Sequence, residues 1–429
     1  MIREIERSGP YRISPKDKDE SLLIESAVQG RALAAERISA LLAGFQLDKM
    51  DVSADDATMA LLEVDQVLLD HFRIEEAVDR DLLTADLAAP RLRLLGGNAG
   101  AKSAESLGVV DRPMQAGDPT SVLPVRAIDR VTAGSTIVLN NIGTRSVGPL
   151  RRFANDLSRV TNTRAQLNAY LSERDAQGFG RHWDDHDVLI LQVRGRKQWS
   201  VFAPAALSPV VGYVDAQQFG EPVFTTVIEP GMGLFLPRGW GHQVRGFGGE
   251  LSVHLTCGMR RMAGLDLIRG WCDVDNARDR VLPSLSFEGL RSFSELDTSG
   301  AAVEDAYGDW RSRSKPLVEN GLIDFWSARQ RLAEGWTIRS IATAAPVFID
   351  ADGLQTYSEV GISAARSCFA LPRGWVGAWA ALLKGHPLLL ADLLELVPGA
   401  SSDEMERWVW ELGGRSLVAF DPPKQDSRL

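Results

Sequence analysis

The stretch GFGRHWDDHDVLILQVRGRKQW, from Gly178 to Trp199, decides the fold. Glycines precede an H-x-D pair, His182 and Asp184, and an almost continuous apolar run over 187–193 follows it. Side chains two residues apart leave the same face of an extended chain, so this imidazole and this carboxylate can bind one cation. The stretch therefore predicts a buried strand with half of a metal site at its start.

The other half of the site is predicted far downstream, in PGMGLFLPRGWGHQV over 230–244, where His242 ends a strand punctuated by glycine and proline. Two imidazoles and one carboxylate that leave coordination positions open form the facial triad typical of non-haem Fe(II) oxygenases. From the residues alone, structural histidines with satisfied hydrogen bonds are an equal alternative, because an H-x-D pair also arises by chance in a chain of this length.

Two further histidines compete for the site. His186 forms H-x-x-x-H with His182, a spacing that suits zinc on a helix. The flanking glycines and β-type residues argue against a helix, and on a strand His186 would lie about 13 Å from His182, too far for one ion. We expect His186 to line the pocket or lie at the surface, and His254, in LSVHLT, to be a core histidine or one that supports the site.

Composition limits the class of protein. The chain has 429 residues, of which 45% are hydrophobic, so it is long enough for two to four globular domains with real cores. A formal charge of -10 argues against a chain that coats nucleic acid. Its three cysteines lack C-x-x-C spacing, and we find neither a signal-peptide core nor an apolar run near about 20 residues. We therefore expect a soluble, cytoplasmic protein without membrane contacts.

The hydrophobic pattern predicts an α+β chain. Helical spacing appears over 21–47 and 58–83, and a Gly/Ser/Pro-containing loop follows 92–95. Strand, helix and strand are predicted over 136–141, 147–160 and 164–172, and residues 187–193 and 197–202 are predicted to pair as a hairpin through Arg194-Gly195. With FTTVIEP, GLFLP, HQVRGF and LSVHLTCG, residues 115–260 are predicted to form an antiparallel barrel or sandwich with the metal at its mouth.

The carboxy-terminal third is predicted to be helical again. Segments 263–280 and 315–334 are candidates for a docking or dimerisation layer, and helix, serine N-cap, helix, Gly-Gly and strand after 386 suggest a winged-helix-like domain. We expect four regions: 1–114, mainly helical; 115–262, the metal-binding β-domain; 263–345, helical; and 346–429, winged-helix-like.

Lys197 lies on the strand after the predicted ligands, and a charge in such a place is ordinarily solvated. A basic side chain that projects into a barrel beside a ferrous site can also pair with the distal carboxylate of a dicarboxylate co-substrate. Asn168 and Tyr170 share one face of the preceding strand and could donate hydrogen bonds to the same molecule. Trp183, Trp199 and Trp240 are expected to pack or to form the pocket wall.

With these residues assembled, the central segment resembles the JmjC-type Fe(II)/2-oxoglutarate-dependent oxygenases of the ribosomal oxygenase (cupin-4) branch. The matching stretches, in the family's order and spacing, are NAYLS (168–172), QGFGRHWDD (177–185), DVLILQVRGRKQW (187–199) and LPRGWGH (236–242). The family's amino-terminal pattern is absent from this chain.

The resemblance implies iron at His182, Asp184 and His242, and 2-oxoglutarate at Lys197, Asn168 and Tyr170. It also implies a double-stranded β-helix (cupin/JmjC) core with amino-terminal helices, a helical dimerisation region of a homodimer and a carboxy-terminal winged-helix-like domain. The implied activity is hydroxylation of a side chain in a protein substrate, such as a ribosomal protein, with succinate and CO2 as co-products.

Four alternatives stay open at this level. Two use the same chemistry, an N-demethylase and a hydroxylase of a peptide natural product. The third is a non-catalytic cupin-like binding protein, which would have no need to keep the three metal ligands and Lys197 together. The fourth is a zinc hydrolase, which would show zinc at the site and no dependence on 2-oxoglutarate.

Overall fold

The computed structural model describes residues 2–4, 7–12, 16–42, 58–83, 92–96, 108–109, 121–122, 124–142, 148–173, 175–176, 178–204, 219–261, 316, 319, 328, 332–351, 358–365 and 367–423. They form two compact units. Unit 1 comprises Met1–Ala35 and Met262–Leu429, and unit 2 comprises Glu36–Arg261. The H-x-D stretch and its downstream partner both lie in unit 2.

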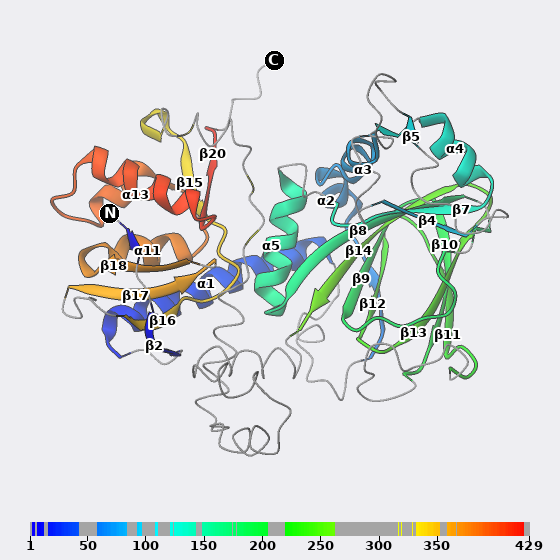
Figure 1. Ribbon diagram of the computed structural model, residues 1–429, viewed down its shortest axis with the longest axis horizontal. Coiled ribbons are helices and arrows are strands. Elements are labelled where there is room, and N and C mark those ends of the chain that lie inside the picture. Colours follow the sequence, from blue (N-terminus) through cyan, green and yellow to red (C-terminus); the bar gives the residue numbers. More distant parts are fainter. Residues whose placement is uncertain are drawn as a thin grey trace, which may run out of the picture. The chain divides into compact units, whose positions relative to one another are not determined.

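Two antiparallel sheets make up most of unit 2 (Figure 1). The smaller sheet has the order β11-β10-β13, with bounds Phe224–Ile228, Arg196–Phe202 and Gly241–Phe247. The larger sheet has the order β3-β12-β9-β14-β8-β7-β4, with bounds Ala60–Glu63, Met232–Leu236, Asp187–Arg194, Leu251–Arg260, Arg164–Glu173, Ser135–Leu139 and Leu92–Gly96. The predicted antiparallel β-domain is confirmed.

The apolar run of the deciding stretch forms β9 in the interior of the larger sheet, between β12 and β14. Residues Val188 to Leu191 are at most 4% exposed, so both faces of the strand are covered. A strand buried on both faces shows a continuous apolar run rather than an alternating one, which explains the pattern.

The predicted hairpin between 187–193 and 197–202 is wrong. β9 pairs with β12 and β14, whereas β10 pairs with β11 and β13, so the chain changes sheet at Gly195. Gly195 has φ +58, and a Cβ there would overlap the carbonyl oxygen of Leu251. Arg-Gly is equally suited to a tight hairpin turn and to a corner between sheets, and strand propensity does not distinguish them.

The amino-terminal part of unit 2 is less helical than predicted. Helix α1 (Lys18–Leu41) confirms the first helical segment as far as Leu41 and contributes residues to both units. Over 58–83 the prediction is wrong for Ala60–Glu63, which form edge strand β3 on β12, and correct for α2 (Gln66–His71) and α3 (Ile74–Leu83). An edge strand of four residues is too short to show its own period.

The predicted strand, helix and strand over 136–141, 147–160 and 164–172 are confirmed as β7, α5 and β8, whereas α4, β5 and β6 were not predicted. Helix α5 (Pro149–Thr161) begins with proline and ends at Asn162, whose left-handed φ of 54 terminates it. Helix α4 (Pro124–Thr132) precedes β7, and β5 (Gly108–Val109) pairs with β6 (Ser121–Val122).

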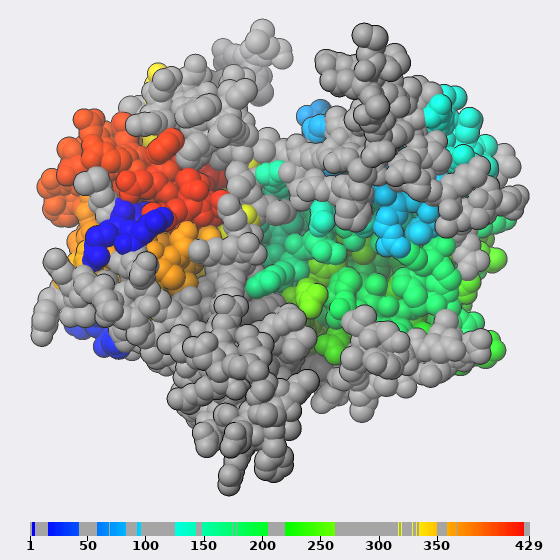
Figure 2. All heavy atoms as spheres, viewed as in Figure 1, coloured from blue at the N-terminus to red at the C-terminus, as the bar shows by residue number. Residues whose placement is uncertain are grey.

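Unit 1 contains two further sheets. The first has the order β1-β18-β17-β16-β2, with bounds Arg3–Glu4, Ser367–Pro372, Glu359–Ala364, Val347–Ala351 and Arg7–Arg12. Figure 2 shows the first residues, in blue, against the orange and red carboxy-terminal segment, in agreement with the pairing of β1 and β18. The second has the order β19-β15-β20, with bounds Leu388–Leu389, Thr337–Ser340 and Val418–Asp421.

Helices of unit 1 pack beside these strands around an apolar core. They are α11 (Val376–Leu383), α12 (Leu390–Glu395) and α13 (Ser402–Gly414), with short 3-10 turns at Leu332–Glu334 and Arg373–Trp375. The predicted helix, serine cap, helix and strand after 386 are confirmed, and Ser401 forms a capping box with Glu404. Assignment of this region as a winged-helix-like domain stays a prediction.

Two predicted segments fall wholly or mostly outside the described residues: 263–280, and 315–334 apart from its last turn. The dimerisation layer predicted there, and the four predicted domain ranges, therefore stay predictions. No described helix has both the length and the apolar character that a membrane crossing requires.

Candidate metal centre

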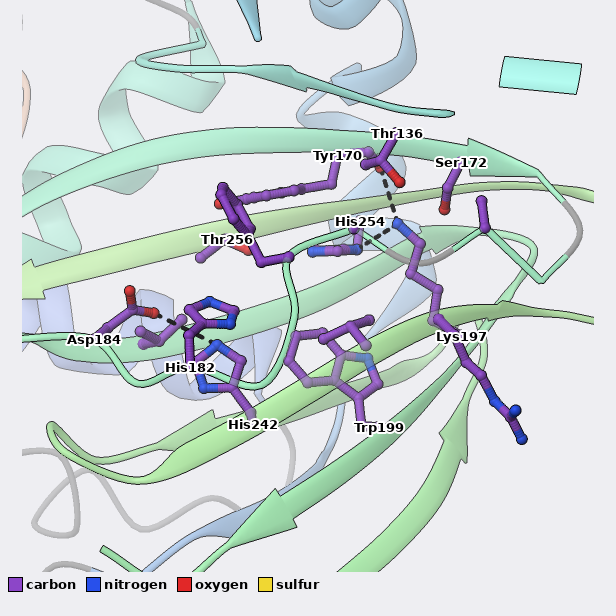
Figure 3. Close-up of a pocket in the computed structure, with 16 residues that line it drawn as sticks. Thr136, Tyr170, Ser172, His182, Asp184, Lys197, Trp199, His242, His254 and Thr256 are labelled. Carbon is purple, nitrogen blue, oxygen red and sulfur yellow. Dashed lines mark hydrogen bonds and ion pairs between the residues drawn. The ribbon is translucent and has the colours of Figure 1, made fainter. Parts of the chain in front are cut away.

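His182, Asp184 and His242 come together at one end of a pocket in unit 2 (Figure 3). One ligand atom from each residue lies within 4.8 Å of the others, and Asp184 Oδ2 is 3.6 Å from His242 Nε2. Two imidazoles and one carboxylate on one side of an ion leave the opposite positions open, as oxygen and co-substrate require. His186, which the sequence excluded on strand geometry, is not part of this group.

Both imidazoles are oriented in the same way. The Nδ1 atom of His182 lies 2.8 Å from the carbonyl oxygen of Gly180, and that of His242 lies 3.3 Å from the carbonyl oxygen of Trp240. If each Nδ1–H donates to its carbonyl, each Nε2 lone pair is left for a metal ion. Burial lowers the pKa of His242 to about 4, with the charge of His182 acting in the same direction, so this imidazole is a neutral ligand at pH 7.

Asp187 ties the two halves of the site together. Its carboxylate accepts a hydrogen bond from the backbone N–H of Arg238 at 2.9 Å and another from Nε of Arg261. In the same loop, the backbone N–H of Gly239 donates to the carbonyl oxygen of Asp184, and Gly239 adopts a φ of +84. The loop that carries His242 is therefore fastened to the segment that carries Asp184.

Lys197 lies at the other end of the pocket and is 2% exposed. Its Nζ is 2.8 Å from Nδ1 of His254 and 3.2 Å from the carbonyl oxygen of Tyr170. Burial lowers the pKa of Lys197 to about 7, and within the described part of the chain no carboxylate pairs with it. Lys197 is therefore buried and not a solvated surface charge, and its predicted contact with the co-substrate stays a prediction.

The surroundings of Lys197 test whether a dicarboxylate fits this pocket. Thr136 Oγ1, Ser172 Oγ and Trp199 Nε1 all line the pocket, and each is buried without a hydrogen-bond partner among the described residues. Figure 3 places Thr136 and Ser172 on the side where the Lys197 side chain ends. Buried hydroxyl groups without partners cost free energy, and an anion beside a lysine would satisfy them. The hydrogen-bonding groups around Lys197 thus fit a carboxylate at this end of the pocket. The ligand atoms of His182, Asp184 and His242 fit a chelated metal ion at the other end.

Of the two further residues predicted to contact 2-oxoglutarate, Tyr170 lines the pocket and Asn168 does not. Tyr170 lines the pocket, and burial together with the charge of Asp184 raises the pKa of its hydroxyl to about 12, so it stays protonated. Asn168 is not among the pocket-lining residues, and its side-chain oxygen accepts a hydrogen bond from the backbone N–H of Asn141 at 3.0 Å. His186 is partly buried and bonds to Asp185 at 2.9 Å.

Sequence reasoning missed the roles of three pocket residues. Thr136 and Ser172 lie on strands β7 and β8, and Ser172 follows Tyr170 by two positions on the same face, a spacing that could have identified it. His254 was expected in the core or in support of the site, and it is 4% exposed, but its contact with Lys197 depends on the pairing of distant strands.

Comparison with known proteins agrees with this geometry. The model of the JmjC domain matches residues 145–267, a range that includes the three candidate ligands and Lys197. The chain carries a JmjC domain. The chain is similar to ribosomal oxygenase 1 of Rattus norvegicus, with 35% identity over 144 residues, which are 32% of this chain and 24% of the rat protein.

The chain is also similar to the bifunctional lysine-specific demethylase and histidyl-hydroxylase NO66 of Drosophila persimilis, with 34% identity over 109 residues. That match covers 25% of this chain and 16% of the fly protein, so the chain spans a quarter or less of these relatives. The structure also resembles the crystal structure of the Escherichia coli ribosomal oxygenase YcfD. The superposition covers 89% of this chain and 99% of the YcfD chain, with a TM-score of 0.50 and 15% sequence identity. That likeness concerns the fold.

Proposed function

We propose that this protein is an Fe(II)- and 2-oxoglutarate-dependent oxygenase that hydroxylates a side chain of a protein substrate. The observation that carries the proposal is that His182, Asp184 and His242 share one pocket with the buried Lys197. The pocket has a volume of about 520 Å³ including its opening to solvent, which suits a small co-substrate together with an inserted side chain.

The chain's own residues divide the work between the two ends of the pocket. His182, Asp184 and His242 would hold Fe(II), and Lys197, Thr136 and Ser172 would hold the distal carboxylate of 2-oxoglutarate. With both bound, this chemistry oxidatively decarboxylates 2-oxoglutarate to succinate and CO2 and inserts an oxygen atom from O2 into a C–H bond of the substrate. The protein excludes water from the buried end and positions the target C–H bond.

The relatives suggest which substrates to test. The rat relative is named a ribosomal oxygenase, and the fly relative is named a histidyl-hydroxylase and a lysine-specific demethylase. We infer that the substrate is a histidine side chain of a ribosomal protein. Demethylation of an N-methyl group is the second candidate, because it begins with the same hydroxylation. We expect the protein to act in the cytoplasm, as a homodimer.

The test is release of succinate from 2-oxoglutarate by the Fe(II)-loaded chain, together with mass spectrometry of ribosomal proteins from cells with and without the gene. We expect a peptide heavier by one oxygen atom only when the gene is present, and no succinate from His182→Ala. An iron-loaded protein that releases no succinate with any peptide would contradict the proposal, and zinc at the site without 2-oxoglutarate dependence would favour a hydrolase.

A further inference from the structure

The ring of His254 is held between two aromatic side chains inside the pocket of unit 2. Its ring stacks on Tyr170 with centroids 4.7 Å apart and planes at 8°, and the edge of Trp199 meets it at 5.5 Å and 68°. Strand β14 changes register against β9 between Val253 and His254. The extra residue at this shift is Val193 on β9, and the side chain of His254, opposite Gln192, lines the pocket.

The fixed ring presents one nitrogen to Lys197. Nδ1 of His254 lies 2.8 Å from Nζ of Lys197, and the carbonyl oxygen of Tyr170 lies 3.2 Å from the same Nζ (Figure 3). An ammonium group has three N–H donors and no acceptor. With two donors directed at His254 and Tyr170, the third is left for a ligand in the pocket.

We propose that His254 is a positioning residue for the co-substrate, because its Nδ1 accepts a hydrogen bond from Lys197 and aims the remaining N–H of that ammonium at the distal carboxylate. The inference rests on the proposed function. Burial and the charge of Lys197 lower the pKa of His254, so the imidazole is neutral and can accept this bond. Without the acceptor, the flexible lysine side chain would keep only the contact with Tyr170.

Two substitutions distinguish the hydrogen-bond acceptor of His254 from the packing of its ring. His254→Phe keeps an aromatic ring to stack on Tyr170 but has no acceptor, whereas His254→Asn keeps an oxygen near the position of Nδ1 but has no ring. The measurement is the Kd of 2-oxoglutarate for the full chain loaded with Mn(II), by titration calorimetry. We expect His254→Phe to raise this Kd by about tenfold or more, and His254→Asn to stay within about threefold of the unmodified chain.

Two controls make the result specific. The Kd of Mn(II) should be the same in both variants, because the metal ligands are untouched. Oxalate chelates the metal but has no distal carboxylate, so we expect its Kd to be unchanged by His254→Phe.

The outcomes are distinguishable. If the unmodified Mn(II)-loaded chain does not bind 2-oxoglutarate, the proposed function fails and this inference fails with it. If it binds and His254→Phe binds equally well, or if the asparagine variant is as weak as the phenylalanine variant, the positioning role alone is overturned. Loss of Mn(II) or oxalate binding in His254→Phe would also overturn it, because the role would then be general packing.

Discussion

His182 and His242 form an isolated antiparallel bridge in which the backbone N–H of each residue donates to the carbonyl oxygen of the other, at 3.1 and 2.7 Å. Their rings lie with centroids 4.2 Å apart. The two imidazoles are therefore placed by main-chain hydrogen bonds between segments far apart in the sequence, and these bonds do not involve the ligand nitrogens. A site built this way loses little conformational entropy when it takes up a metal.

Removal of one ligand should abolish metal binding while the fold is kept. We expect His182→Ala to weaken Mn(II) affinity by at least about a hundredfold, since even residues that only support a ligand change affinity by about 10- to 100-fold. The backbone bridge does not need the imidazole, so the melting temperature of the metal-free protein should change little. His186→Ala is the matched control and should bind Mn(II) normally; equal losses in both variants would contradict the assignment of the ligands.

Asp187 should support the site without touching the metal. Asp187→Asn replaces a carboxylate that accepts from Arg238 N–H and from Arg261, so both hydrogen bonds lose the negative charge and one of them loses its acceptor. We expect Mn(II) affinity to fall by about tenfold or more, measured by titration calorimetry. Asp185→Asn changes a carboxylate that bonds to His186 instead, and its Mn(II) affinity should remain normal.

Binding of 2-oxoglutarate should depend on pH through Lys197. Burial lowers its pKa to about 7, so the side chain is an ammonium below that pH and a neutral amine above it. A carboxylate needs the ammonium, and binding above the pKa therefore requires uptake of a proton. We expect the affinity to be constant below about pH 7 and to fall by up to about tenfold for each pH unit above it.

The control for this pH dependence is Lys197→Met, which should bind 2-oxoglutarate weakly at every pH and lack the decline. If the Kd of 2-oxoglutarate for the unmodified protein does not change from about pH 6 to about pH 9, Lys197 stays charged throughout this range and the prediction is wrong.

The corner between the two sheets should tolerate only glycine. Gly195→Ala adds a Cβ that overlaps the carbonyl of Leu251 at a residue with φ +58. We expect the free energy of unfolding to fall by about 2 kcal/mol or more, measured by denaturant or thermal unfolding. Gly220→Ala is the control, because a Cβ there meets nothing within 4 Å; if both substitutions cost the same, the corner is not strained.

The capping box of α13 should contribute measurably to unit 1. Ser401 Oγ accepts from the backbone N–H of Glu404 at 3.3 Å, and the carboxylate of Glu404 accepts from the N–H of Ser401 at 2.9 Å. We expect Ser401→Ala to lower the free energy of unfolding by about 1 kcal/mol. Ser402→Ala, one position later, should cost less, and a reversed order would show that the cap lies elsewhere.

Patterns that depend on near neighbours were predicted correctly. The apolar run after Asp187 became a doubly covered strand, and the serine before α13 became its cap. The wrong predictions concern segments whose local sequence is compatible with two different backbone conformations. Arg194-Gly195 suits a hairpin or a corner, and the short strand Ala60–Glu63 has a partner, β12, only in the folded sheet.

The sequence by itself determined which groups could form the pocket, because residue types and spacing single out a pair of imidazoles, a carboxylate and a nearby lysine, and the family resemblance favoured a metal site over structural histidines. The prediction that His186 is not a ligand agrees with the structure, but the strand that it assumed over 182–186 begins only at Asp187. Only the tertiary structure decided that Lys197 is buried and held by His254, and that Thr136 and Ser172 lie beside it without partners. Those relationships arise from strand pairing between distant segments, and the free energy that selects such pairings belongs to the whole sheet.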